Sequence, residues 1–135
     1  MIHLDTSFLV DALRESRRDQ EGPARAWLAD HDDEALALSV FVMAEMLVGA
    51  ERHADPARER ARVERACGDL PMVLPDARLA GTYATVHAGL ASLGTPVAVM
   101  DLLIGCTALN AQAPLLTANP SHFAKIPALR VLTYR

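Results

Sequence analysis

Three acidic residues lie where the surrounding sequence is almost entirely apolar. Asp5 directly follows a short apolar run at the beginning of the chain, Glu45 lies within segment 40–49, and Asp101 lies within segment 97–105. On a helix, the neighbours of Glu45 and of Asp101 three and four residues away are apolar or glycine, which predicts that both carboxylates lie on buried faces. Because buried acids are rare unless they are paired or bind a metal ion, these three residues are candidates for a functional site.

The chemistry of such a site follows from electrostatics. Two carboxylates 4 Å apart repel each other by about 4 kcal/mol at an effective dielectric constant of 20. Three converging carboxylates would therefore take up protons or hold a cation, and ligands that are all oxygen favour Mg²⁺ or Mn²⁺. Such an ion can ionise a water molecule near neutral pH, and a phosphodiester is its natural substrate. The alternative for each acid is a structural role, as a helix cap or an arginine partner.

Short apolar strands alternate with helices along the chain, which predicts a three-layer α/β fold: a short, mostly parallel sheet with helices on both faces. The expected strands are 2–4, 35–38, 71–75, 114–117 and 129–133. The expected helices are 8–13, 23–31, 40–53, 56–67, 77–93 and 99–111, followed by one turn at 119–123. No repeat or linker interrupts the pattern, so residues 1–135 are expected to form one domain.

Helix caps are predicted at four places. Thr6 or Ser7 is expected to cap the first helix, and Ser39, Asp55 and Asp76 are expected to cap later ones. In a parallel sheet, ligands bind beyond the carboxyl ends of the strands, and the first strand would deliver its acidic residue to that edge.

The composition is that of an ordinary globular protein, with 51% hydrophobic and 22% charged residues in 135. The net charge of −4 argues against broad, sequence-blind binding of nucleic acid. No apolar run reaches the roughly 18 residues that a membrane span needs, and no secretory signal is visible, so a cytoplasmic location is expected. Cys67 and Cys106 have no metal-ligand spacing and are expected to be reduced, packed thiols.

Four motifs in order give the chain a resemblance to the PIN-domain nucleases, and within them to the VapC toxin ribonucleases of type II toxin–antitoxin pairs. The motifs are residues 4–7 (LDTS), Glu45 in the helix after the second strand, residues 101–105 (DLLIG) and residues 116–123 (LTANPSHF). The resemblance spans essentially the whole chain.

This resemblance implies a metal-dependent endoribonuclease that leaves a 5′-phosphate and a 3′-hydroxyl. It also implies a homodimer, within a larger toxin–antitoxin assembly, that a VapB-like antitoxin inhibits near the active site. Asp5 and Asp101 would bind Mg²⁺ or Mn²⁺, and Glu45 would bind it directly or through water. The supporting residues would be Thr6, Ser7, Thr117 and Asn119.

The last motif departs from the family pattern, because many members have a further acid where this chain has Asn119. The number of metal ions is therefore open, and a catalytically weak module that binds RNA or protein is the alternative function. His122 is interpreted as a turn residue, with a proton shuttle as the other possibility. The arginines between positions 52 and 65 fit a solvated, ion-paired face, or a contact with RNA or antitoxin.

Overall fold

The computed structural model describes residues 1–135, and it contains one five-stranded sheet flanked by helices. The strands are β1 (Ile2–Leu4), β2 (Leu36–Ser39), β3 (Met72–Val73), β4 (Leu115–Leu116) and β5 (Val131–Leu132). The helices are α1 (Thr6–Arg17), α2 (Pro23–Asp30), α3 (Val40–Glu51), α4 (Pro56–Cys67), α5 (Arg78–Ser92), α6 (Val99–Asn110) and α7 (Pro120–Phe123). The expected α/β class and the expected order of elements are confirmed.

All neighbouring strands are parallel, in the order β3-β2-β1-β4-β5. The central strand β1 pairs with β2 through Ile2 and Leu36, and with β4 through His3 and Leu115. The chain therefore first builds the sheet outward on one side of β1 and then returns to build the other side. This reversal places a topological switch point between β1 and β4, which is where open parallel sheets bind ligands.

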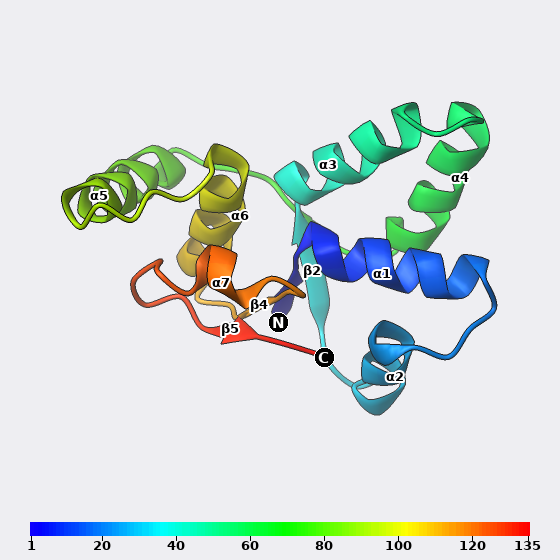
Figure 1. Ribbon diagram of the computed structural model, residues 1–135. Helices are drawn as coiled ribbons and strands as arrows, with labels where there is room; N and C mark the ends of the chain where they lie inside the picture. Colours follow the sequence, from blue (N-terminus) through cyan, green and yellow to red (C-terminus); the bar gives the residue numbers. More distant parts are fainter.

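The helices divide between the two faces of the sheet according to this path. Connections between parallel strands are almost always right-handed, so reversing the direction of travel moves the helices to the opposite face. Figure 1 shows α1 to α4 on one side and α5, α6 and α7 on the other. The core between these layers is a cluster of 22 buried residues. Phe8 of α1 is fully buried in it and makes edge-on contacts with Trp27 and Tyr134.

Two of the predicted caps are confirmed. The Ser39 hydroxyl accepts a hydrogen bond from the Val42 amide at 3.2 Å, and the Asp55 carboxylate accepts one from the Arg58 amide, also at 3.2 Å. Each bond satisfies an amide that has no partner within its helix.

The other two cap predictions are wrong in detail. Helix α1 begins at Thr6, so Asp5 and neither Thr6 nor Ser7 occupies the capping position, and no side chain caps this helix. Both hydroxyls are bonded to carboxylates instead, as described below. Asp76 lies one residue further from its helix than expected, although its carboxylate still accepts a hydrogen bond from the Arg78 amide at 2.9 Å.

No helix in the structure is both long enough and apolar enough to cross a membrane.

Candidate active site

The candidate site lies at the switch point, just beyond the carboxyl ends of β1 and β4. Asp5 follows β1 and Thr117 follows β4, so the parallel register of the two strands brings both residues to the same edge. The Asp5 amide donates to the carbonyl of Leu116 at 2.9 Å, which fixes the backbone at this position. Both side chains are almost fully buried, Asp5 with 5% and Thr117 with 0% of its surface exposed.

Hydroxyl groups hold one oxygen of the Asp5 carboxylate. The Ser7 and Thr117 hydroxyls each donate to Asp5 Oδ2 at 2.7 Å. Each hydroxyl has one proton to give, so its oxygen remains free to accept, and it accepts a backbone amide: Ala118 donates to Ser7 and Asn119 donates to Thr117, both at 2.9 Å. This network orients Asp5 and leaves its other oxygen, Oδ1, without a hydrogen bond from the protein.

Glu45 is half-buried in the second turn of α3, and its carboxylate is bound to the beginning of α1. The Thr6 hydroxyl donates to Glu45 Oε1 at 2.6 Å. Because Thr6 directly follows Asp5, this bond joins the two acidic residues through adjacent positions of the backbone. The second oxygen, Oε2, has no hydrogen-bond donor in the protein.

Asp101 lies in the first turn of α6 and is also half-buried, with 23% of its side chain exposed. Its Oδ2 lies 3.0 Å from Nδ1 of His122 in α7. Burial raises the pKa of Asp101 above its ordinary value; the facing His122 lowers it, and the negative charge of Asp5 raises it. The two carboxylates, of Asp5 and Asp101, are therefore close enough to interact electrostatically.

The structure does not draw the three carboxylates together into one tight group. No three His, Cys, Asp or Glu side chains lie close enough to hold a metal ion as they stand. Asp5 and Asp101 interact through their charges, whereas Glu45 is linked to Asp5 only through the hydroxyl of the next residue, Thr6. All three nevertheless share one arrangement: a single oxygen is held by a neighbouring side chain, and the other has no protein donor.

This arrangement fits a hard divalent cation. The oxygens without protein donors are carboxylate oxygens, which Mg²⁺ and Mn²⁺ prefer, and Mg²⁺ sites in proteins commonly combine one or two carboxylates with several waters. The hydrogen-bonded oxygens meet the need of a metal-ligating carboxylate for an orienting partner.

The contact of His122 with Asp101 was not predicted from the sequence. His122 does lie in a single helical turn, as expected for 119–123, and Pro120 begins that turn. Its ring, however, faces Asp101, which lies 21 positions earlier in the chain, and no local sequence pattern predicts such a pairing. The Asn119 side chain is half-buried and makes no hydrogen bond, and its backbone amide supports Thr117.

A family model described as "PIN domain" matches residues 2–129. The chain belongs to the PIN-domain family. The match covers β1, the switch point and all three acidic residues, so the geometry described above is that of a PIN domain.

Named relatives cover most of this PIN domain. A ribonuclease VapC of Rickettsia bellii is 30% identical over 137 residues, covering 96% of this chain and 93% of that protein. A tRNA(fMet)-specific endonuclease VapC of Salmonella typhimurium is 30% identical over 96 residues, covering 71% of this chain and 73% of that protein. Among solved structures, DNA-bound VapBC of Salmonella typhimurium aligns with a TM-score of 0.88 and 25% identity, over 100% of both chains.

Proposed function

We propose that this PIN domain is a metal-dependent endoribonuclease of the VapC type: the toxin of a toxin–antitoxin pair, neutralised by a VapB-like antitoxin. The observation that carries the proposal is that three carboxylates, Asp5 at the switch point with Asp101 and Glu45 on the surrounding helices, each have one hydrogen-bonded oxygen and one oxygen free of protein donors. Two relatives named as VapC nucleases, each 30% identical, support the same activity.

The proposal covers residues 1–135 as one domain that acts on RNA in the cytoplasm as a homodimer. The 22-residue core supports a single domain, because it includes residues from both faces of the sheet.

In this proposal Asp5 and Asp101 hold the ion, which would be Mg²⁺ or Mn²⁺, and Glu45 reaches it directly or through water. When bound, the ion supplies the positive charge that a phosphodiester needs near carboxylates, and it lowers the pKa of a water molecule for attack on phosphorus. Ser7 and Thr117 fix the orientation of Asp5, and Thr6 fixes that of Glu45. Asn119 positions Thr117 through its backbone amide and adds no charge.

The test is cleavage of RNA by the wild type and by Asp101→Asn, with Asp30→Asn as a matched control. Asp30 is exposed at the end of α2 and forms no ion pair, so its substitution makes the same change of charge away from the site. We expect Asp101→Asn to lower the rate of cleavage by about 100-fold or more, since metal-assisted charge stabilisation contributes several kcal/mol. EDTA should abolish wild-type cleavage, and Mg²⁺ or Mn²⁺ should restore it.

Sequencing of RNA ends after pulse expression would identify the RNA that is cut. Identical end profiles for wild type and Asp101→Asn would overturn the enzymatic proposal. Binding of RNA or antitoxin without turnover would instead favour the alternative of a binding module.

A further inference from the structure

Three arginines lie along one stripe of α4. Arg58, Arg62 and Arg65 are spaced by four and three residues, which places them on the same face of a helix. None of them forms an ion pair in the structure, unlike Arg60 on another face of the same helix, which pairs with Glu51. A helical rise of 1.5 Å per residue spreads the three charges over about 10 Å.

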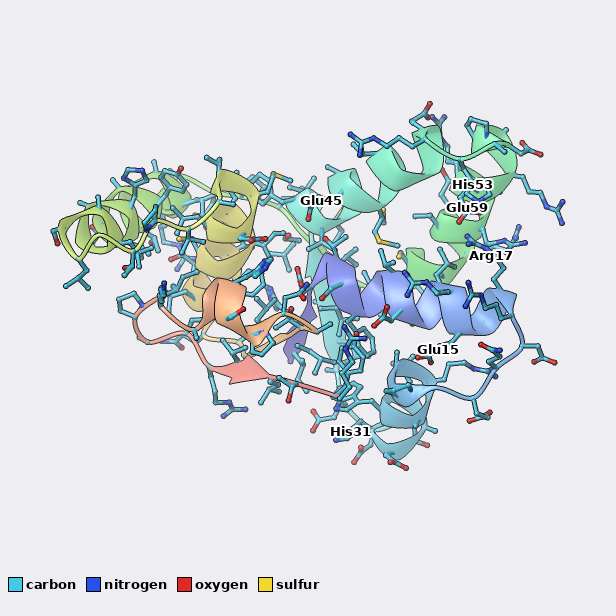
Figure 2. All side chains as sticks on the ribbon, in the orientation of Figure 1. Glu15, Arg17, His31, Glu45, His53 and Glu59 are labelled. Carbon is cyan, nitrogen blue, oxygen red and sulfur yellow. The ribbon has the colours of Figure 1, made fainter.

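Three neighbouring cavities, which share lining residues, extend from Glu45 of the candidate active site to this stripe. The first, of about 190 Å³, lies between α1, α3 and α4, with Glu45 at one end and Arg17, His53 and Glu59 at the other. Figure 2 shows Glu45 in the first half of α3, and the other three residues gathered toward the C-terminal ends of α1 and α3.

The path then continues along α4. A second cavity, of about 230 Å³, shares Arg17 with the first and adds Arg58 and Arg62. A third, of about 430 Å³, is lined again by Arg17 and Arg62 and adds Arg65. We call this path, defined by Arg17, Arg58, Arg62 and Arg65, the arginine groove.

The charge along the arginine groove is positive beyond its beginning at Glu45. The buried Glu59 carboxylate is paired with Arg17, so its charge is compensated within the protein. It also lies 3.9 Å from the His53 ring. Asp55 directs its carboxylate to the amide at the beginning of α4.

We propose that the arginine groove binds the phosphate backbone of the single-stranded RNA that is cut at the Glu45 end. The inference rests on the proposed function, because it takes the carboxylate site as the point of cleavage. An RNA strand has to continue away from that point, and the groove is the path that begins at Glu45. Guanidinium groups bind phosphate oxygens in a bidentate manner, so unpaired arginines suit a phosphate backbone. The chain as a whole carries a charge of −4, so the attraction is local.

Binding is tested with a fluorescently labelled 12-nucleotide single-stranded RNA in EDTA, which keeps the strand intact. The variant is Arg62→Ala/Arg65→Ala, and the control is Arg130→Ala, which removes one arginine outside the groove. Arg130 is exposed, forms no ion pair and directly precedes β5. It therefore lies at the amino ends of the parallel strands, whereas the site lies beyond their carboxyl ends. Circular dichroism and a thermal melt verify that the variants are folded.

We expect the double variant to bind the RNA roughly tenfold more weakly at 0.1 M salt. The slope of log K against log salt should become shallower by about 1.4, since each lost phosphate contact on a single strand removes about 0.7. Arg130→Ala should match the wild type. Equal affinity and equal slope for wild type and double variant would overturn the proposal. So would unchanged RNA binding together with a weakened complex with the coexpressed antitoxin, because the groove would then bind an acidic polypeptide.

A second measurement separates this inference from the proposed function. In the presence of Mg²⁺, the double variant should cleave the 12-nucleotide RNA with a raised KM and an unchanged kcat, and it should cleave a trinucleotide as the wild type does. A wild-type chain that binds the 12-nucleotide RNA with the predicted salt dependence but never cleaves RNA would refute the proposed activity and leave the groove standing. A double variant with lowered kcat and unchanged KM would refute the groove alone.

Discussion

At the scale of single residues, the chemistry depends on how a buried carboxylate is kept in place. Asp5 lies at the end of β1 with almost no exposure, and two hydroxyls donate to the same one of its oxygens. Such bonds fix the direction of the carboxylate. Bulk water in place of the two hydroxyls would neither orient the Asp5 carboxylate nor keep one of its oxygens free.

The Thr117 hydroxyl is expected to stabilise the metal-free protein measurably. Thr117→Val keeps the shape and removes a donor to a buried carboxylate, so we expect the free energy of unfolding to fall by about 1.5–3 kcal/mol at pH 7 in EDTA. The control is Thr107→Val in α6, where the buried hydroxyl donates to the Leu103 carbonyl, and there the loss should stay near 1 kcal/mol or below. Urea unfolding measures both, and equal losses would contradict the importance given to Asp5.

His122 is expected to act as a positioning residue for Asp101 through its Nδ1 atom, at a separation of 3.0 Å. The amide nitrogen of Asn can take the place of Nδ1, whereas that of Gln replaces the more distant Nε2. His122→Asn should therefore keep cleavage near the wild-type rate, and His122→Leu and His122→Gln should lose 10- to 100-fold in activity and in Mn²⁺ affinity. Titration of Mn²⁺ followed by electron paramagnetic resonance provides the second readout. A uniform loss in all three variants would argue against positioning by Nδ1.

The residues that could be predicted from sequence are those whose signal is local. Asp5 directly follows an apolar strand, so its place at the sheet edge follows from its neighbours. The contact between His122 and Asp101 joins positions 21 residues apart on two helices, and no periodicity encodes it. The cap predicted for Thr6 or Ser7 was wrong because both hydroxyls are used by carboxylates, a competition that is visible only once the strands and helices are assembled.

At the scale of elements, α4 carries two different faces. Its buried face presents Glu59, Val63 and Cys67 to the core, and the adjacent stripe presents unpaired arginines. Glu59 is tolerated among apolar side chains because Arg17, at the end of α1, reaches it. The pair thereby fixes the position of α4 against α1, and with it the geometry of the arginine groove.

Removing Arg17 should expose the dependence of α4 on this pair. Arg17→Ala leaves Glu59 buried with only His53 nearby, so the free energy of unfolding should fall by about 1–3 kcal/mol. Arg60→Ala removes the other arginine pair of α4, with Glu51, whose two side chains are each 54% exposed, and should cost less than about 1 kcal/mol. Thermal and urea unfolding of the two variants side by side measure the difference. An equal cost would mean that burial of Glu59 is not compensated by Arg17.

The kinds and order of the elements could be predicted, and the order of the strands in the sheet could not. Alternation of apolar strands with helices is a local pattern, and Pro71 and Pro75 correctly bracket β3. The neighbours of β1 depend on long-range pairing, between Ile2 and Leu36 and between His3 and Leu115, which no single segment specifies. The last three strands were predicted too long and the second was predicted one residue too early for the same reason, since pairing decides where a ladder stops.

At the scale of the whole molecule, one core joins the two faces of the sheet. Cys67 at the end of α4 and Cys106 in the middle of α6 lie on opposite faces and belong to the same buried cluster. Burial raises the pKa of the Cys67 thiol, and it raises that of Cys106 from its usual value of 9.0 to about 11. The thiol expectation from sequence, of two free and packed cysteines, is confirmed.

These thiols are reporters of cooperative unfolding. Neither should react with Ellman's reagent at pH 8 in the native protein, because both are buried and protonated, and both should react in urea. If the protein is one domain, the two cysteines become reactive at the same urea midpoint, which single Cys→Ala variants can resolve. Two separate midpoints would indicate two independent units.

Cys106 also contributes to the pH dependence of the free energy of unfolding. Because the pKa of its thiol is higher in the folded than in the unfolded protein, its stabilising contribution is complete below pH 9.0 and is lost as the pH rises toward about 11.

The central position of β1 also has a consequence for protein synthesis. The first strand to leave the ribosome acquires its second neighbour only when residue 115 has been made, and the Asp5 carboxylate acquires its second hydroxyl donor only at Thr117. At a translation rate of about 5–20 residues per second, this interval is on the order of ten seconds. A nascent polypeptide therefore carries Asp5 for most of its synthesis before the pair of hydroxyl donors that orients this carboxylate is complete.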